Sequence, residues 1–112
     1  MCTKEAVVMA LLLGQSVAGF AQTPANAEAA LALAKRNDCF KCHAIDRAKR
    51  GPAYRDVAAR LRNRPDGVEA IVGHITSGRL VRLEDGNEVN HRIIDTTDPD
   101  ELANFARWLL AL

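Results

Sequence analysis

The sequence predicts an all-α domain of about four helices with a short β-hairpin late in the chain. Aromatic residues make up only 4% of the 112 residues, whereas Ala and Leu are abundant, a composition typical of helices. Four apolar stripes recur at helical spacing, and most of them begin next to capping residues. The hairpin is expected from Asp85-Gly86, a turn signal between two short apolar alternations within residues 79–94.

The first two expected helices flank the most informative stretch of the chain. The first begins at Asn26, whose side chain can cap it, and runs to Asn37. Its apolar stripe consists of Ala27, Ala30, Leu31 and Ala34, and the small alanines on it would let another helix approach closely. The second helix is short and is marked by Tyr54, Val57, Ala58 and Leu61.

The third expected helix begins at Asp66, which forms a capping pattern with Glu69, and Gly78 can end it. Its apolar face consists of Val68, Ile71, Val72 and Ile75. His74 lies about 100° away from this face in a helix of 3.6 residues per turn. We therefore expect His74 to be a surface residue and not a metal ligand.

The last expected helix has the clearest start. Asp98 is its cap, Pro99 occupies the first turn and Glu101 closes a capping box. Its apolar stripe contains Leu102, Phe105, Leu109 and Leu112, with Trp108 on the flank. We expect this helix to cross the alanine-rich first helix.

The start of the chain resembles a secretory leader. Lys4 provides a charged start, residues 6–13 form an apolar run, and Gly19-Phe20-Ala21 offers a cleavage site. The apolar run is too short to span a bilayer. The expected division is therefore a signal peptide over residues 1–21 and one mature domain over residues 22–112, with no stable membrane insertion after cleavage.

The stretch Cys39-Phe40-Lys41-Cys42-His43 is typical of c-type haem attachment. Each of the two thiols can form a thioether with one haem vinyl group, and His43 can then bind the iron as the proximal ligand. Cys2 lies in the predicted leader, which leaves Cys39 and Cys42 as the thiols of the mature chain. The expected cofactor is one covalently attached haem c.

Three other interpretations of the two cysteines are weaker. A thioredoxin-like pair would need a βαβ pattern around it, whereas the flanking residues predict helices. A zinc site would need a second pair of ligands, and no second C-x-x-C or H-x-x-H follows. A disulfide between cysteines this close in sequence would stabilise little.

Gly51-Pro52-Ala53-Tyr54 follows the haem motif. The carbonyl of Pro52 could accept the Nδ1 proton of His43, which would fix the ring and strengthen it as a ligand. The alternative is an ordinary Gly-Pro turn before a helix.

Several segments together resemble the small bacterial class I cytochromes c: residues 39–43, 44–46 and 51–58, and the ending 106–110. The resemblance covers the chain from about Ala27 to Leu112. It implies a few helices around one haem, crossing first and last helices, and single-electron transfer in the periplasm. By the same resemblance, Cys39, Cys42 and His43 have the attachment and proximal roles, and Pro52 supports the histidine.

The sequence departs from this family at the distal iron ligand. The family uses a methionine in a proline-rich loop, but the only methionines here are Met1 and Met9, and residues 79–94 contain no proline. His91 lies within a residue or two of the expected position, and in an extended chain it would share an apolar face with Val89 and Ile93. A one-residue shift would present Asn90 instead. His91 is the favoured ligand, with Asn90 or an open site as alternatives.

A second imidazole favours ferric iron more than a thioether does, so we expect a midpoint potential below that of the His/Met family. The favoured function is an electron carrier, and the alternative is a protein that binds CO, NO or O₂ at an open sixth position. We expect no enzymatic activity, because no acid–base constellation surrounds the loop.

The formal net charge of +1 indicates no nucleic-acid partner. Charge is nevertheless uneven along the chain, which could steer the protein to redox partners with acidic docking surfaces, although solvated helix faces explain the pattern equally well. The basic residues that gather in the haem-binding half are Lys35, Arg36, Lys41, Arg47, Lys49, Arg50, Arg55, Arg60, Arg62 and Arg64. The later acidic residues are Glu84, Asp85, Glu88, Asp95, Asp98, Asp100 and Glu101.

Overall fold

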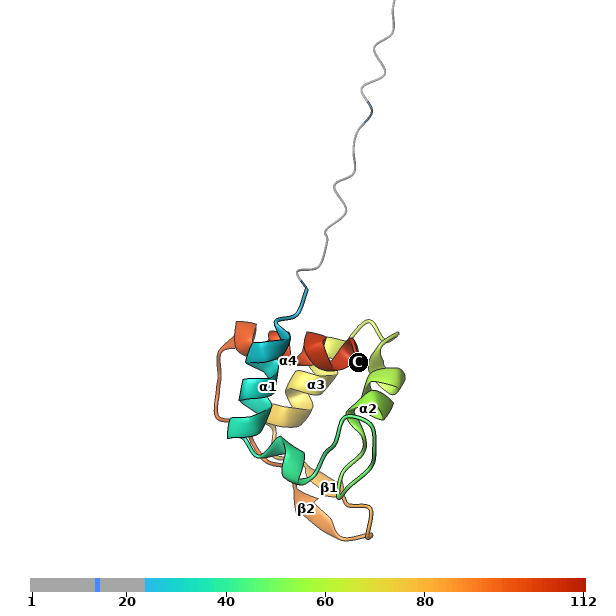
Figure 1. Ribbon diagram of the computed structural model, residues 1–112. Coiled ribbons are helices and arrows are strands. Elements are labelled where there is room, and N and C mark those ends of the chain that lie inside the picture. The colour runs from blue at the N-terminus through green and yellow to red at the C-terminus, as the bar shows by residue number, and fades with distance from the viewer. Residues whose placement is uncertain (1–13, 15–23) are drawn as a thin grey trace, which may run out of the picture.

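The computed structural model describes Gly14 and residues 24–112 (Figure 1). In chain order the elements are α1 (Ala27–Arg36), the 3₁₀ turn η1 (Cys39–Lys41), α2 (Tyr54–Leu61), α3 (Gly67–Thr76), β1 (Leu80–Arg82), β2 (Glu88–Asn90) and α4 (Pro99–Leu110). The expected helical domain with one hairpin is confirmed. Apart from Gly14, the predicted leader lies outside the described residues. Among the helices of the described part, none has the length and apolar character needed to cross a membrane.

Helix α4 lies at the centre of the packing and contacts α1, α2 and α3, as Figure 1 shows at the end of the domain away from the hairpin. Its buried residues are Leu102, Phe105, Ala106, Trp108 and Leu109. On α1 the buried face consists of Ala30, Leu33 and Ala34. The predicted stripes were therefore partly wrong: Ala27 is exposed, Leu33 is fully buried and Trp108 belongs to the core.

Two of the predicted helix caps form. The side chain of Asn26 accepts a hydrogen bond from the backbone N–H of Ala29 at 3.0 Å, and that of Asp98 accepts one from Asp100 at 2.9 Å. Each bond satisfies one of the N–H groups that the first turn of a helix leaves free.

The two predicted capping boxes do not form, because arginines take the carboxylates. Arg64 donates to both oxygens of Asp66, at 2.9 and 2.6 Å, and Asp66 makes no capping hydrogen bond to α3. Glu101 forms an ion pair with Arg36 of α1 instead of reaching back to Asp98. The local sequence pattern of a capping box does not show whether an arginine outside the helix will bind the same carboxylate.

The hairpin is antiparallel, with Leu80 opposite Asn90 and Val81 opposite Val89. Its turn contains Gly86 at φ +86°, a conformation that glycine adopts without strain. The extended chain ends at Asn90, whereas the sequence argument had extended it to Ile93. Val89 and Ile93 are 38% and 59% exposed, so the expected apolar wall around His91 does not form in this way.

Asn37 joins the end of α1 to the segment that follows the hairpin. It is 1% exposed, and its side-chain nitrogen donates to the carbonyl of Leu33 at 2.9 Å and to the Asp95 carboxylate at 3.0 Å. Its side-chain oxygen accepts from the backbone N–H of Asp95 at 3.0 Å. These bonds, together with one from Arg36, lower the pKa of Asp95.

Replacing Asn37 by Ala should destabilise the protein by about 2 kcal/mol, because it leaves buried partners without hydrogen bonds. Urea denaturation of the haem-containing protein, followed by circular dichroism, measures the change. Asn63→Ala is the matched control, since Asn63 is exposed and a surface change of this kind costs less than about 0.5 kcal/mol. Equal stability of the two variants would contradict the proposed role of Asn37.

Candidate functional site

The two cysteines lie on one tight turn. Asp38 leaves α1 with φ 57° and begins η1, in which Cys42 N–H donates to the carbonyl of Cys39 at 3.2 Å. In a 3₁₀ turn, side chains three residues apart are eclipsed, so the thiols of Cys39 and Cys42 project to the same side. His43 follows directly and donates its own N–H to the carbonyl of Cys39 at 3.0 Å.

The ring of His43 is held by three neighbours. Its Nδ1 lies 2.7 Å from the carbonyl oxygen of Pro52, which can only accept, so Nδ1 carries the proton and donates. On one face the ring stacks on Tyr54, with ring centres 4.8 Å apart and planes 25° apart. The backbone of Gly51 lies against the ring edge. This arrangement leaves Nε2 as the unprotonated nitrogen.

Burial controls the protonation of these groups. It lowers the pKa of His43, although the Pro52 carbonyl acts in the opposite direction. A neutral imidazole is the form that binds metals. Burial also raises the pKa of the Cys39 thiol. A redox-active pair needs a lowered thiol pKa, so this environment argues against the thioredoxin-like alternative.

His91 faces His43 from the segment that follows β2. The two ring centres are 6.3 Å apart, with the planes inclined at 48°. The Nδ1 atom of His91 lies 2.9 Å from the carbonyl oxygen of Arg92, which can only accept, so this nitrogen also donates and Nε2 is the nitrogen left without this bond. Asn90, the alternative in the sequence argument, points elsewhere and donates its side-chain N–H to the carbonyl of Gly78 at 2.9 Å.

Two residues near the site were not predicted to belong to it. Tyr54 was read only as part of a helical stripe, but it links His43 to the core through edge-on contacts with Phe105 and Trp108 at 6.3 and 6.0 Å. His74 was expected on the surface but is only partly exposed, because its ring packs edge-on against His91 with ring centres 4.4 Å apart. Burial, and then His91, lower the pKa of His74 to about 4. The helical stripes in the sequence did not indicate these contacts, because the contacts join residues from different segments of the chain.

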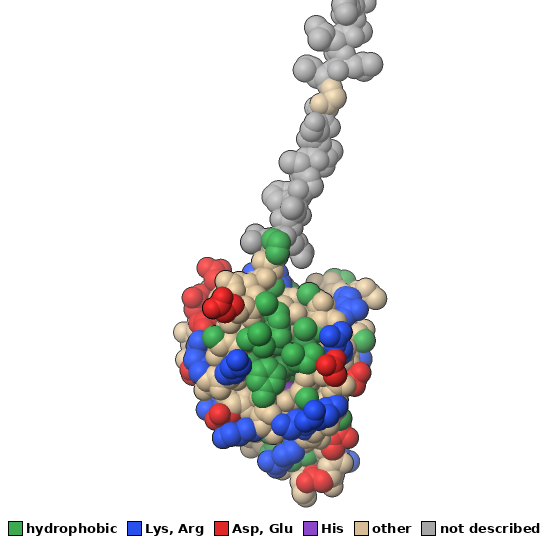
Figure 2. All heavy atoms as spheres, in the orientation of Figure 1, with side chains coloured by type: hydrophobic (Ala, Val, Ile, Leu, Met, Phe, Trp, Pro, Cys, Tyr) green, Lys and Arg blue, Asp and Glu red, His purple; other side chains and the backbone are tan. Residues whose placement is uncertain are grey.

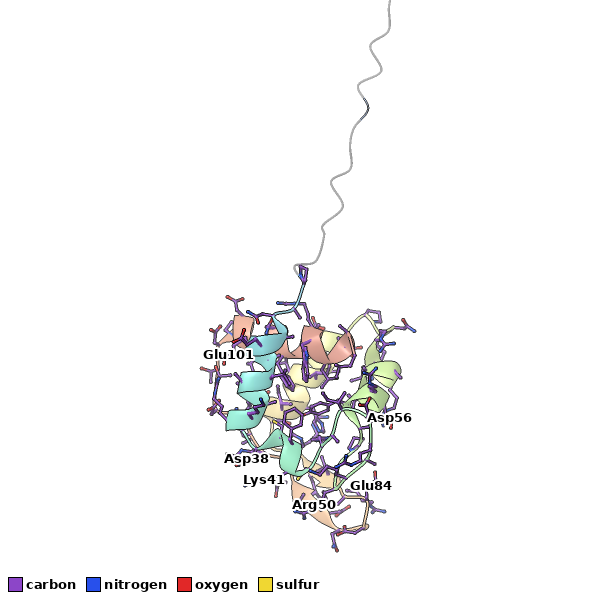
Figure 3. All side chains as sticks on the ribbon, viewed as in Figure 1. Asp38, Lys41, Arg50, Asp56, Glu84 and Glu101 are labelled. Atoms are coloured by element: carbon purple, nitrogen blue, oxygen red, sulfur yellow. The ribbon has the colours of Figure 1, made fainter. Side chains whose placement is uncertain are left out.

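The site opens on an apolar face of the molecule. Figure 2 shows hydrophobic side chains gathered between α1 and α2, with Lys and Arg along the edge nearer the hairpin. In Figure 3, Lys41 and Arg50 lie at this hairpin end together with Asp38 and Glu84. In residues 24–112, no group of three or more His, Cys, Asp or Glu side chains is arranged to hold a metal ion.

Several of the basic residues counted in the sequence are already paired. Arg36 bonds Asp95 and Glu101, Arg55 bonds Asp46, and Lys41 lies 3.5 Å from Asp38. The positive charge of the haem-binding half is therefore partly neutralised within the protein. Lys41 remains 76% exposed at the edge of the apolar face.

No family model matches the chain. Individual relatives do match it. Cytochrome c-551 of Pseudomonas denitrificans is 32% identical over 84 residues, which cover 71% of this chain and 93% of that protein. Cytochrome c-552 of Nitrosomonas europaea is 37% identical over 62 residues, covering 55% of this chain and only 54% of that protein.

Among solved structures, the class 1 cytochrome MtoD from Sideroxydans lithotrophicus ES-1 superposes with a TM-score of 0.74 at 36% identity. This match covers 78% of the chain and 96% of MtoD. The matches cover nearly the whole length of the Pseudomonas cytochrome c-551 and of MtoD. They agree with the helices, the hairpin and the cysteine turn described above. This chain belongs to the class I cytochromes c.

Proposed function

We propose that this protein is a periplasmic monohaem c-type cytochrome that carries single electrons, with His43 and His91 as the two iron ligands. The observation that carries the proposal is the pair of facing imidazoles beside the cysteine turn. Membership of a family of cytochromes c supports electron transfer, and the predicted leader over residues 1–21 supports export across the inner membrane.

The spacing of the two rings fits one iron between them. A metal–imidazole bond is about 2 Å long and the ring centre lies about 1 Å beyond the nitrogen, so two rings sharing one metal have centres about 6 Å apart. The observed separation of His43 and His91 is 6.3 Å. Both rings donate from Nδ1 to a backbone carbonyl, which leaves Nε2 of each ring to bind the iron and strengthens each ligand.

Each residue has a separate task in this proposal. Cys39 and Cys42 would hold the haem through thioethers, and the bound haem supplies an iron that exchanges one electron. Burial favours the neutral form of His43, and Pro52 and Tyr54 orient its ring. His91 fills the position for which the mature chain has no methionine, so the midpoint potential is lower than in the His/Met members of the family.

Binding of CO, NO or O₂ at an open sixth position is the competing function. It would require His91 to stay away from the iron, whereas the ring centres of His91 and His43 are 6.3 Å apart, a separation that one iron could bridge. We therefore propose the carrier.

The exposed Lys41 and the neighbouring Arg50 lie at the hairpin end of the domain, near the edge of the apolar face through which a partner would approach (Figure 3). Such charges raise the rate of encounter with an acidic docking surface and are screened by salt. We propose redox proteins with acidic surfaces as the partners.

Gly51→Ala should lower the amount of covalently bound haem, because the added Cβ would lie 2.7 Å from Cε1 of His43. The ring could move aside only by losing its bond to Pro52. Haem per protein is measured from the pyridine haemochrome spectrum. Gly73→Ala in α3 is the control, since the nearest atom to its Cβ is a flexible arginine nitrogen at 3.8 Å. Full haem content and an unshifted midpoint potential in Gly51→Ala would contradict this account of His43.

The ferrous protein should keep its absorption spectrum when CO is added, because both axial positions are filled. The ferric protein should give a low-spin electron paramagnetic resonance (EPR) signal, and the midpoint potential should lie more than about 60 mV below that of a His/Met relative, a factor of ten for one electron. Asn90→Ala should leave all three unchanged. A prompt spectral shift with CO would favour the ligand-binding function instead, and loss of the low-spin signal in Asn90→Ala would make Asn90 the ligand.

Oxidation of the ferrous protein by the hexacyanoferrate(III) anion, which takes up one electron, should slow as salt rises, because the rim of the site is positive. Lys41→Gln should lower the rate at low salt by roughly twofold or more. Arg64→Gln removes the same charge from the turn between α2 and α3, at the end of the domain away from the hairpin (Figure 1), and should have a smaller effect. Equal rates for the two variants would remove the steering role of Lys41.

A further inference from the structure

A third imidazole lies next to the two proposed ligands. The ring of His74 contacts that of His91 edge-on, with the centres 4.4 Å apart and the planes at 60°. His91 thus has His43 at 6.3 Å and His74 at 4.4 Å. Within residues 24–112, neither ring nitrogen of His74 has a hydrogen-bond partner, although the side chain is half-buried.

His74 and His91 are carried by segments that are tied to each other. His74 lies in the last turn of α3, and the carbonyl of Ile75 accepts the N–H of Ile94 at 2.9 Å. The N–H of His91 donates to the carbonyl of Arg79, just beyond the same helix, at 2.8 Å. These two bonds keep the His91 segment next to the end of α3, so His74 stays close to the sixth position whether or not His91 occupies it.

The two imidazoles differ in how firmly their surroundings hold them. Nδ1 of His91 is bonded to the carbonyl of Arg92, whereas His74 has both nitrogens free of protein partners in the described part of the chain. His74 projects from a helix that packs on α4, and His91 from a loop after a three-residue strand. An imidazole that lies on a helix beside the proposed iron site and has no other partner is available to bind the metal.

We propose that His74 is a second distal ligand, which takes the sixth position on the iron when His91 leaves it. The proposal rests on the proposed function, because it presumes a haem held by His43. In the exchange, the bond between iron and Nε2 of His91 breaks and a bond between iron and a nitrogen of His74 forms. Both rings act as neutral donors throughout, so no electron or proton is transferred.

Such an exchange keeps the iron six-coordinate and low-spin without the loop ligand. It would hold the protein in its electron-carrying form and closed to small molecules such as CO while the loop around His91 moves. To take the place of the His91 ring, the His74 ring would move by about the 4.4 Å that separates their centres. The space that it needs is vacated when His91 leaves.

The test compares four haem-containing proteins by EPR of the ferric form and by CO binding to the ferrous form: wild type, His74→Ala, His91→Ala and the double variant. Wild type and His74→Ala should be low-spin with His91 bound. His91→Ala should remain low-spin, with a shifted signal, because His74 binds. The double variant should be high-spin and should bind CO at least about tenfold faster than His91→Ala.

A high-spin His91→Ala protein that matches the double variant would overturn the role of His74 and leave the ligation by His91 intact. A high-spin wild type would overturn the proposed function itself. If His74→Ala alone became high-spin, His74 would be the resident ligand and the assignment of His91 would be wrong. Low-spin signals in all four proteins would identify another group as the ligand and overturn both assignments. Should His91→Ala retain no haem, His91→Leu replaces it, since leucine is similar in size and has no atom that can bind iron.

Discussion

The orientation of one imidazole, that of His43, depends on contacts from three parts of the chain, and the rest of the site depends on it. The cysteine turn fixes the backbone position of His43. The carbonyl of Pro52 accepts a hydrogen bond from its Nδ1, and the ring of Tyr54 stacks on its face with the ring centres 4.8 Å apart. Tyr54 in turn contacts Phe105 and Trp108 of α4. The proposed proximal ligand on a short turn is thereby coupled to the main core, which consists of α4 packed against the other three helices.

The distal side is built by a different kind of interaction. His91 is positioned by the hydrogen bond from its backbone to Arg79 and by the neighbouring bond between Ile94 and Ile75, and its ring contacts His74. The buried Asn37 then fixes Asp95 to the end of α1. Because backbone bonds do not depend on side-chain identity, this segment can change its residues, and with them its ligand, while its path through the fold stays the same.

Local patterns predicted much of this structure, and long-range contacts account for the failures. The caps at Asn26 and Asp98 involve neighbours two or three residues away, which a sequence displays directly. The box at Asp98 failed because Arg36, 65 residues from Glu101, takes the carboxylate of Glu101. The carbonyl of Pro52 accepts from His43 as predicted, because nine residues of loop return it to the same place. His74 was misplaced because a helical wheel shows the face of one helix but not the loop that covers it.

The covalent anchor explains why a class I cytochrome c can differ from its family at the sixth ligand. Where axial bonds alone hold a haem, a change of distal ligand also threatens retention of the cofactor. With two thioethers and a proximal histidine in place, the distal residue affects the iron's potential and its access to small molecules, but retention does not depend on it. The same fold superposes on MtoD with a TM-score of 0.74, and the proposed function has it accept an imidazole from the proline-free segment that follows the hairpin. In the proposed function, the loss of methionine therefore changes the potential of the carrier and preserves its architecture.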